Sequence, residues 1–202
     1  MLLDTPVTAF LLVLNGLIGA YTLFVDPSLV GKWSFRPALA KRREEMQRWI
    51  TAGFVHTGLF HLLLNVWALY LFGPYVESAL GPLRFLLLYL GSDLAANALT
   101  YWRHKDNPNY SAVGASGAIS GVLFSFVLFE PFSTITLLIP PIPMYAIIFA
   151  FVYVAVSIYA SNRGGGRIAH EAHLGGALGG VVLTLLLYPA ALGIFLGQMG
   201  LG

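Results

Sequence analysis

The sequence predicts an all-α membrane protein with six transmembrane helices, of which the fourth is short and begins below the membrane surface. Three observations favour this fold class. Hydrophobic residues make up 57% of the 202 residues and charged residues only 10%, whereas a soluble domain has about 25% charged residues. The mean hydropathy is +0.76. The apolar residues also form runs, several of them long enough to cross about 30 Å of hydrocarbon as a helix.

We expect these helices to follow one another in a single domain covering residues 1–202. Their approximate ranges are 7–24, 59–75, 83–101, 116–129, 144–159 and 170–187. Asp26-Pro27 ends the first helix and Gly81-Pro82 separates the second from the third, because proline cannot continue a helix. Further prolines precede the fifth helix and follow the sixth, namely Pro140, Pro141, Pro143 and Pro189.

The fourth predicted helix, 116–129, is too short to connect the two headgroup layers. It should therefore begin below the membrane surface, with the preceding loop dipping in to meet it. Irregular backbone is tolerated at that depth only where it is buried in protein or lines a water-filled cavity. The sequence thus predicts an aqueous pocket around Ser116.

The fourth and sixth predicted helices carry matching faces of small residues. Gly117 and Gly121 are four residues apart on the fourth helix, and Gly176 and Gly180 repeat this spacing on the sixth. Glycines at this spacing let two helices approach backbone to backbone. We therefore expect these two faces to pack against each other.

This packing would bring Ser116 next to His173, which shares a helix face with the glycines of the sixth helix. A serine hydroxyl is a weak nucleophile until a neighbouring base takes its proton, and a neutral histidine does so near pH 7. Ser116 and His173 are therefore candidate catalytic residues. Glycine faces with a serine are also common helix-packing devices in membranes, so this pair alone leaves a purely structural interpretation open.

The second predicted helix adds further polar side chains. His61 and Asn65 are four residues apart and project from one helix face. Together with the backbone N–H of Ser116 they could form an oxyanion hole, in which removal of one donor typically costs about 10²–10³ in rate. The alternative is a helix cap or an interhelical hydrogen bond. We expect His56 to be a structural hydrogen-bonding residue near the membrane surface.

Four short motifs occur in order along the chain. They are the E-x-x-R of Glu45 to Arg48, a single motif of F-x-H followed by H-x-x-x-N that contains His56, His61 and Asn65, the G-x-S-G of Gly114 to Gly117, and the A-H-x-x-G-x-x-x-G of Ala172 to Gly180. This set resembles the motifs of the rhomboid intramembrane serine proteases. Any one motif is weak evidence, but four in this order across six helices are highly specific.

The resemblance implies a Ser116–His173 dyad without an acidic third member. Such an endopeptidase cleaves single-span membrane proteins in or near their transmembrane segment, so its partners are these substrates and the lipid bilayer. The resemblance also assigns His61, Asn65 and the Ser116 amide to the oxyanion hole, and implies neither metal nor cofactor. The fifth helix and the loop at 160–167 are similar to the gate and cap through which substrate and water enter.

One position departs from the family pattern. Many rhomboid proteases carry an aromatic residue four positions after the nucleophile, where its ring packs on the catalytic histidine. Here that position is Ser120. We expect either another aromatic residue or hydrogen bonds to hold His173 instead, and the pocket for the residue before the cleaved bond to differ.

Two indications of orientation disagree. The resemblance implies the plasma (inner) membrane of a prokaryote, both termini in the cytoplasm and an active site that opens to the extracytoplasmic side. Basic loops usually face the cytoplasm, yet ten of the eleven Lys and Arg residues fall in the loops on the dyad's side. They are Lys32, Arg36, Lys41, Arg42, Arg43, Arg48, Arg103, Lys105, Arg163 and Arg167. We follow the family topology, because several of these cations belong to a folded surface loop.

Other functions compete with proteolysis. A non-proteolytic rhomboid-like protein that binds transmembrane helices would usually lack the serine or the histidine, and both are present. A metal-dependent protease or metal transporter is disfavoured because HEAH at 170–173 is not the HExxH zinc motif. A transporter with a broken helix near Pro140 would need an inverted repeat, which the sequence does not show. The net charge of +2 gives no support for nucleic-acid binding.

Overall fold

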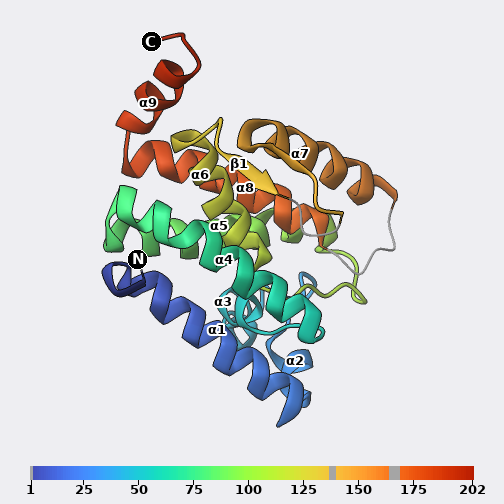
Figure 1. The fold of residues 1–202 in the computed structure, drawn as a ribbon. Coiled ribbons are helices and arrows are strands. Elements are labelled where there is room, and N and C mark those ends of the chain that lie inside the picture. The colour runs from blue at the N-terminus through green and yellow to red at the C-terminus, as the bar shows by residue number, and fades with distance from the viewer. Residues whose placement is uncertain (1, 137–139, 164–168) are drawn as a thin grey trace.

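Helix α6 (Ser116–Phe129) lies inside a bundle of helices (Figure 1). It contacts α4 (Leu59–Leu80), α5 (Pro82–His104) and α8 (His170–Leu187) in the computed structural model of the chain. The structure describes residues 2–136, 140–163 and 169–202. Most side chains of α6 are buried. Contacts with the neighbouring helices therefore stabilise this short helix, which begins at Ser116.

The other helices surround this centre. They are α1 (Pro6–Phe24), α2 (Ser28–Trp33), α3 (Arg48–Thr51), α7 (Ala146–Arg163) and α9 (Ala190–Gln198), with 3₁₀ turns at η1 (Leu2–Asp4), η2 (Arg43–Glu45) and η3 (Ala52–Phe54). Helix α1 packs on α4, whereas α7 packs on α8 and α6. Figure 1 shows α1 and α7 at opposite edges of the bundle.

The structure is mostly helical, as the composition predicts, and helices occupy all six of the predicted ranges. Among the described residues, α1, α4 and α8 are long and apolar enough to cross a membrane, and α6 and part of α7 are shorter apolar helices. The count of six transmembrane helices therefore stays a prediction. The predicted loop at 160–167 falls partly in α7, which extends to Arg163, and residues 164–168 lie outside the described part.

The predicted start of the fifth helix at Met144 is wrong. Met144 and Tyr145 belong to strand β2 (Pro143–Tyr145), which pairs antiparallel with β1 (Thr134–Thr136). Helix α7 starts directly after β2, and the N–H of Ala146 donates to the carbonyl of Ser133 at 2.9 Å. Pairing with the preceding strand has taken the two residues that an apolar pattern assigns to a helix. The C-terminal tail also forms a helix, α9.

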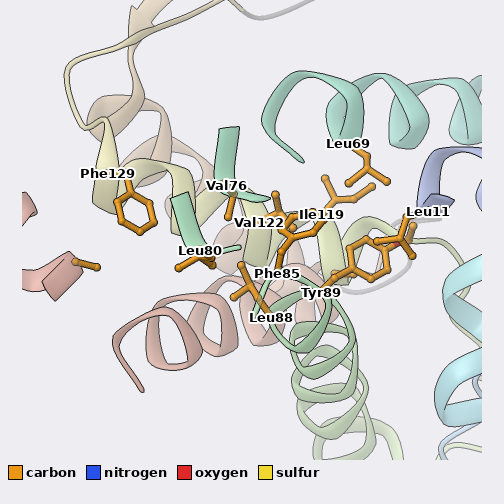
Figure 2. Close-up of a cluster of buried hydrophobic side chains, with 13 residues drawn as sticks. Leu11, Leu69, Val76, Leu80, Phe85, Leu88, Tyr89, Ile119, Val122 and Phe129 are labelled. Atoms are coloured by element: carbon orange, nitrogen blue, oxygen red, sulfur yellow. The ribbon is translucent and has the colours of Figure 1, made fainter. Parts of the chain in front are cut away.

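The largest apolar cluster joins α1, α4, α5 and α6 (Figure 2). Each of these helices contributes at least one almost fully buried side chain, namely Leu11, Leu69, Phe85 and Val122. Lipid tails are as apolar as these side chains, so close packing rather than water exclusion stabilises such a cluster in a membrane. The cluster fixes α6, and with it Ser116, against three neighbouring helices.

A buried carboxyl group fastens α1 to α4. Glu77 on α4 accepts hydrogen bonds from the backbone N–H groups of Val7 and Thr8, at 3.0 and 2.6 Å, and from the Thr8 hydroxyl at 2.7 Å. The first N–H groups of a helix have no partner within the helix. Glu77, a side chain of α4, therefore supplies the hydrogen-bond acceptor that N–H groups at the beginning of α1 lack within their own helix.

Candidate active site

Ser116 is the first residue of α6, and the residues before it hold it in place. The N–H of Gly114 donates to the carbonyl of Ala52 at 2.9 Å, and Ala115 is fully buried. Gly114 has a φ of +113°, a backbone conformation that favours glycine. The loop therefore enters the bundle through a sharp turn and delivers Ser116 at the helix start, as the shortness of this helix predicts.

Ser116 lies within hydrogen-bonding distance of His173. The Nε2 atom of His173 is 2.9 Å from the Ser116 Oγ atom, and both side chains are half-buried. The two residues are 57 positions apart in sequence and come from the beginnings of α6 and α8. This distance suits proton transfer from a serine hydroxyl to an imidazole.

The glycine faces of α6 and α8 make this contact possible. A Cβ atom at Gly176 would lie 2.0 Å from the carbonyl oxygen of Gly117, and one at Gly180 would lie 2.3 Å from the Cα atom of Gly121. Both distances are too short for real atoms. A methyl group at either position would push the two helices, and with them Ser116 and His173, apart.

His61 and Asn65 lie on the first two turns of α4. The His61 ring faces the loop before Ser116, since a Cβ atom at Gly114 would lie 2.7 Å from His61 Nε2. The other ring nitrogen, Nδ1, is 3.2 Å from the Thr57 hydroxyl. If that hydroxyl donates to Nδ1, Nε2 carries the proton and can donate towards the loop.

The Asn65 amide already has one partner within its own helix. It donates to the carbonyl of His61 at 2.8 Å, and its second N–H is a further donor. Asn65 is buried. Asn65 therefore makes a hydrogen bond within its own helix, as a purely structural role would require. The second N–H of its amide is still able to donate to another acceptor.

His56 is fully buried before α4 begins. Its ring contacts the His61 ring edge to face, with 5.0 Å between centroids. Burial, and next the neighbouring His61, lower the pKa of His56 to about 4, so the ring is neutral near pH 7. His56 is therefore an uncharged ring that packs against the His61 ring.

Arg48 and Glu45 organise the first loop rather than the dyad. The Arg48 guanidinium forms a salt bridge with Glu45. It also donates to the carbonyls of Gly31 and Ser34, at 3.0 and 2.9 Å. One cation thus connects α3, η2 and the end of α2 into a folded loop.

A ring from α7 stacks on His173. The Tyr153 and His173 rings are 5.7 Å apart between centroids and 25° from parallel. The Tyr153 hydroxyl is 2.5 Å from the Ser120 Oγ atom. Of the two arrangements expected for the position of Ser120, the structure therefore shows another aromatic residue on the histidine.

One cavity borders Ser116 and a second borders His61. The smaller, about 10 Å³, is lined by Ser116, Gly53, Asp93 and Asn97 among others, and a space of this size holds about one water molecule. The larger, about 160 Å³, is lined by residues that include His61 and Thr57. Ser116 lines the smaller cavity, whereas the larger one borders His61 and not Ser116. The aqueous pocket around Ser116 stays a prediction.

Glu171 connects α8 to the ends of α5 and α7. The Ser161 hydroxyl donates to Glu171 Oε1 at 2.8 Å, and His104 Nε2 and Arg103 Nε lie 3.3 and 3.5 Å from the same oxygen. No set of three His, Asp or Glu side chains among the described residues could hold a metal ion. Glu171, two residues before His173, therefore links helices through hydrogen bonds and ion pairs.

Comparison with known proteins decides the family. The model of the Rhomboid domain matches residues 43–190. The chain belongs to the rhomboid family. The resemblance inferred from the four motifs is thus confirmed.

Individual relatives agree with this assignment. The rhomboid is 33% identical over 184 residues to "Putative rhomboid protease YdcA" of Bacillus subtilis, covering 90% of this chain and 88% of that protein. It is 32% identical over 139 residues to "Rhomboid protein 1, mitochondrial" of Saccharomyces cerevisiae, covering 66% and 39%. For "Rhomboid protease GluP" of Bacillus subtilis the values are 31% over 136 residues, covering 67% and 25%. The chain thus spans most of the first relative but less than half of the other two.

Family membership and the apolar helices make this rhomboid an integral membrane protein. Relatives that are named rhomboid proteases support an intramembrane protease at the level of the family. The relatives include bacterial and mitochondrial proteins, so the identity of the membrane stays a prediction.

Sequence reasoning missed two features of this rhomboid. Tyr153 lies in a mostly apolar stretch of α7, where neither spacing nor a motif marks it. The Ser161–Glu171 bond depends on how α7 and α8 meet. The only signal in the sequence was the absence of an aromatic residue at Ser120, which implied a substitute but not its position.

Proposed function

We propose that this rhomboid is a serine endopeptidase that cleaves single-span membrane proteins in or near their transmembrane segment. The observation that carries the proposal is the 2.9 Å separation between His173 Nε2 and Ser116 Oγ. Membership in a family with named proteases supports the same reaction class.

In the first half of the reaction, Ser116 Oγ attacks the carbonyl carbon of the scissile peptide bond, and its proton passes to His173 Nε2. The tetrahedral intermediate collapses, the C–N bond breaks, and the imidazolium gives its proton to the leaving amine. A water molecule then attacks the acyl ester while His173 takes its proton. Collapse of the second intermediate releases the new carboxyl group and returns the proton to Ser116.

The negative oxygen of each intermediate needs hydrogen-bond donors. The backbone N–H of Ser116 is one candidate, because the first N–H groups of α6 have no acceptor inside the helix. His61 Nε2 and the second N–H of Asn65 are the other two. The His61 ring faces the loop that precedes Ser116, and Asn65 follows one turn later on the same helix, which supports this assignment.

The location of the enzyme is also part of the proposal. We place it in a prokaryotic plasma membrane, with both termini in the cytoplasm and the active site open to the extracytoplasmic side. The folded state of the first loop supports this choice over the rule for basic loops. Arg48 is buried in that loop and paired with Glu45, so it is not a free cytoplasmic charge.

Covalent labelling with a serine-directed phosphonate tests the dyad. We expect the wild-type protein to be labelled and the Ser116→Ala and His173→Ala variants to lose both labelling and cleavage of a single-span substrate, while remaining folded. A metal chelator should change neither activity of the wild type. Near-normal cleavage by either variant would contradict the dyad. A folded wild type that is never labelled and cleaves nothing would favour the helix-binding alternative.

A further inference from the structure

One face of the His173 ring is covered by a small group of aromatic rings. Tyr153 stacks on His173 at 5.7 Å, and Tyr153 is in turn flanked by Phe124 of α6 and Phe149 of α7, each with 5.8 Å between ring centroids. The Tyr153 ring is therefore itself confined by neighbours from two helices.

The Tyr153 hydroxyl gives the ring a fixed orientation. Ser120 donates its only hydroxyl proton to the carbonyl of Ser116 at 2.6 Å. The 2.5 Å contact between Ser120 and Tyr153 must then be a bond in which Tyr153 donates to Ser120 Oγ. A chain of two hydrogen bonds thus connects the tyrosine to the backbone of the candidate nucleophile.

We infer that Tyr153 is a positioning residue that holds the His173 ring in line with Ser116, and that Ser120 is its anchor. The inference rests on the proposed protease function, because it assigns a role within the same dyad. An imidazole bonded at one nitrogen can still rotate about that bond. A stacked ring on its face restricts this rotation, and its π face also favours the positive charge that His173 gains during attack.

Ser120 and Tyr153 act as a pair in this arrangement. A small residue at position 120 leaves room for a ring that comes from α7, and its hydroxyl accepts the bond that orients this ring. The aromatic group on His173 therefore comes from a helix that packs at the edge of the bundle (Figure 1).

The rate constant for phosphonate labelling of Ser116 tests the inference. We expect Tyr153→Leu to lower this rate constant and kcat by about 10-fold with little change in KM, because only the alignment of the dyad is lost. Tyr153→Phe keeps the ring and should retain most of the rate, and Ser120→Ala should behave like Tyr153→Phe. Phe151→Leu, on the exposed side of α7, is the matched control and should leave the rate unchanged.

Rescue provides a second variant. In Tyr153→Leu, the additional change Ser120→Phe places a ring on α6 one turn after Ser116, and we expect it to restore part of the labelling rate. A labelling rate constant is a property of the folded molecules, so partial unfolding of a variant lowers the labelled amount and not the rate constant.

Two results would overturn the inference. One is a Tyr153→Leu variant with the rate constant of the wild type. The other is a faster Tyr153→Leu variant, which would mean that the ring only fastens α7 and slows access to Ser116. Neither result affects the proposed function. That function fails if the wild type is neither labelled nor able to cleave, or if Ser116→Ala or His173→Ala cleaves at a near-normal rate.

Discussion

At the scale of single residues, Asn65 combines an observed structural hydrogen bond with a proposed catalytic role. Its amide bonds to the carbonyl of His61 four residues earlier. Asn15 on α1 makes the same kind of bond, to the carbonyl of Leu11 at 2.8 Å. Both asparagines are buried, but Asn15 lies in α1 and Asn65 lies one turn after His61 on α4. The two residues therefore form a matched pair in which only one is expected to contribute to catalysis.

We expect Asn65→Ala to lower kcat by about 10- to 100-fold, because the oxyanion would lose one of three donors. Asn15→Ala removes an equivalent intrahelical bond together with the 3.2 Å bond to the Tyr89 hydroxyl on α5, and should leave kcat close to that of the wild type. The measurement is turnover of a single-span substrate at saturating concentration, with thermal unfolding of both variants recorded in parallel. An Asn65→Ala variant with unchanged turnover would remove Asn65 from the oxyanion hole.

Residue-scale roles were only partly accessible from sequence. The motifs mark Ser116, His173, His61 and Asn65 because their spacing places them on helix faces. Tyr153 has no such mark, since its role depends on how α7 docks against α6 and α8. The roles assigned to the first four stay predictions until the variants are measured.

At the scale of secondary-structure elements, the contact between α6 and α8 has no spare space. Gly180 meets the backbone of Gly121, and backbone atoms cannot move aside as the end of a flexible side chain can. By contrast, Gly16 in α1 has no neighbouring atom within 4 Å of the position that a Cβ would take. The same substitution should therefore have opposite effects in the two helices.

We expect Gly180→Ala to destabilise the protein by roughly 1–3 kcal/mol, the usual cost of overpacking, and to lower cleavage because Ser116 and His173 separate. Gly16→Ala should be neutral or slightly stabilising, since alanine is the better helix former by about 1 kcal/mol. Thermal unfolding in detergent, followed together with cleavage, measures both effects. Equal unfolding temperatures for the two variants would contradict the close helix contact.

The positions of the elements were more predictable than their ends. Long apolar runs bounded by proline or polar loops place helices in the right ranges, and the start of α6 at Ser116 follows from the short apolar run. The strands β1 and β2 were missed because their pairing joins segments on either side of a proline-rich stretch. No local pattern of apolar residues reports such a pairing.

At the scale of the whole molecule, the proposed topology predicts that the dyad faces the extracytoplasmic side of the membrane. The chain contains no cysteine, so single cysteines can be introduced without background. Glu44 in the first loop and Ser78 near the end of α4 are both exposed. In the proposed topology these two positions lie on opposite sides of the membrane.

We expect Glu44→Cys to react with a membrane-impermeant maleimide in intact cells of a bacterial host, and Ser78→Cys to react only after the cells are permeabilised. Neither substitution removes a positive charge, so the balance of basic loops is kept. Labelling in the reverse order would place the active site on the cytoplasmic side, as the distribution of Lys and Arg indicates.

The Glu77 contact with the beginning of α1 has a consequence for biosynthesis. Glu77 is synthesised about seventy residues after Val7 and Thr8, whose backbone N–H groups donate hydrogen bonds to it. Until α4 arrives, those N–H groups need water, and a lone carboxyl group is costly in hydrocarbon. The beginning of α1 and the Glu77 side chain therefore leave water together, which makes the joining of the first two long helices a single step in the assembly of the protein.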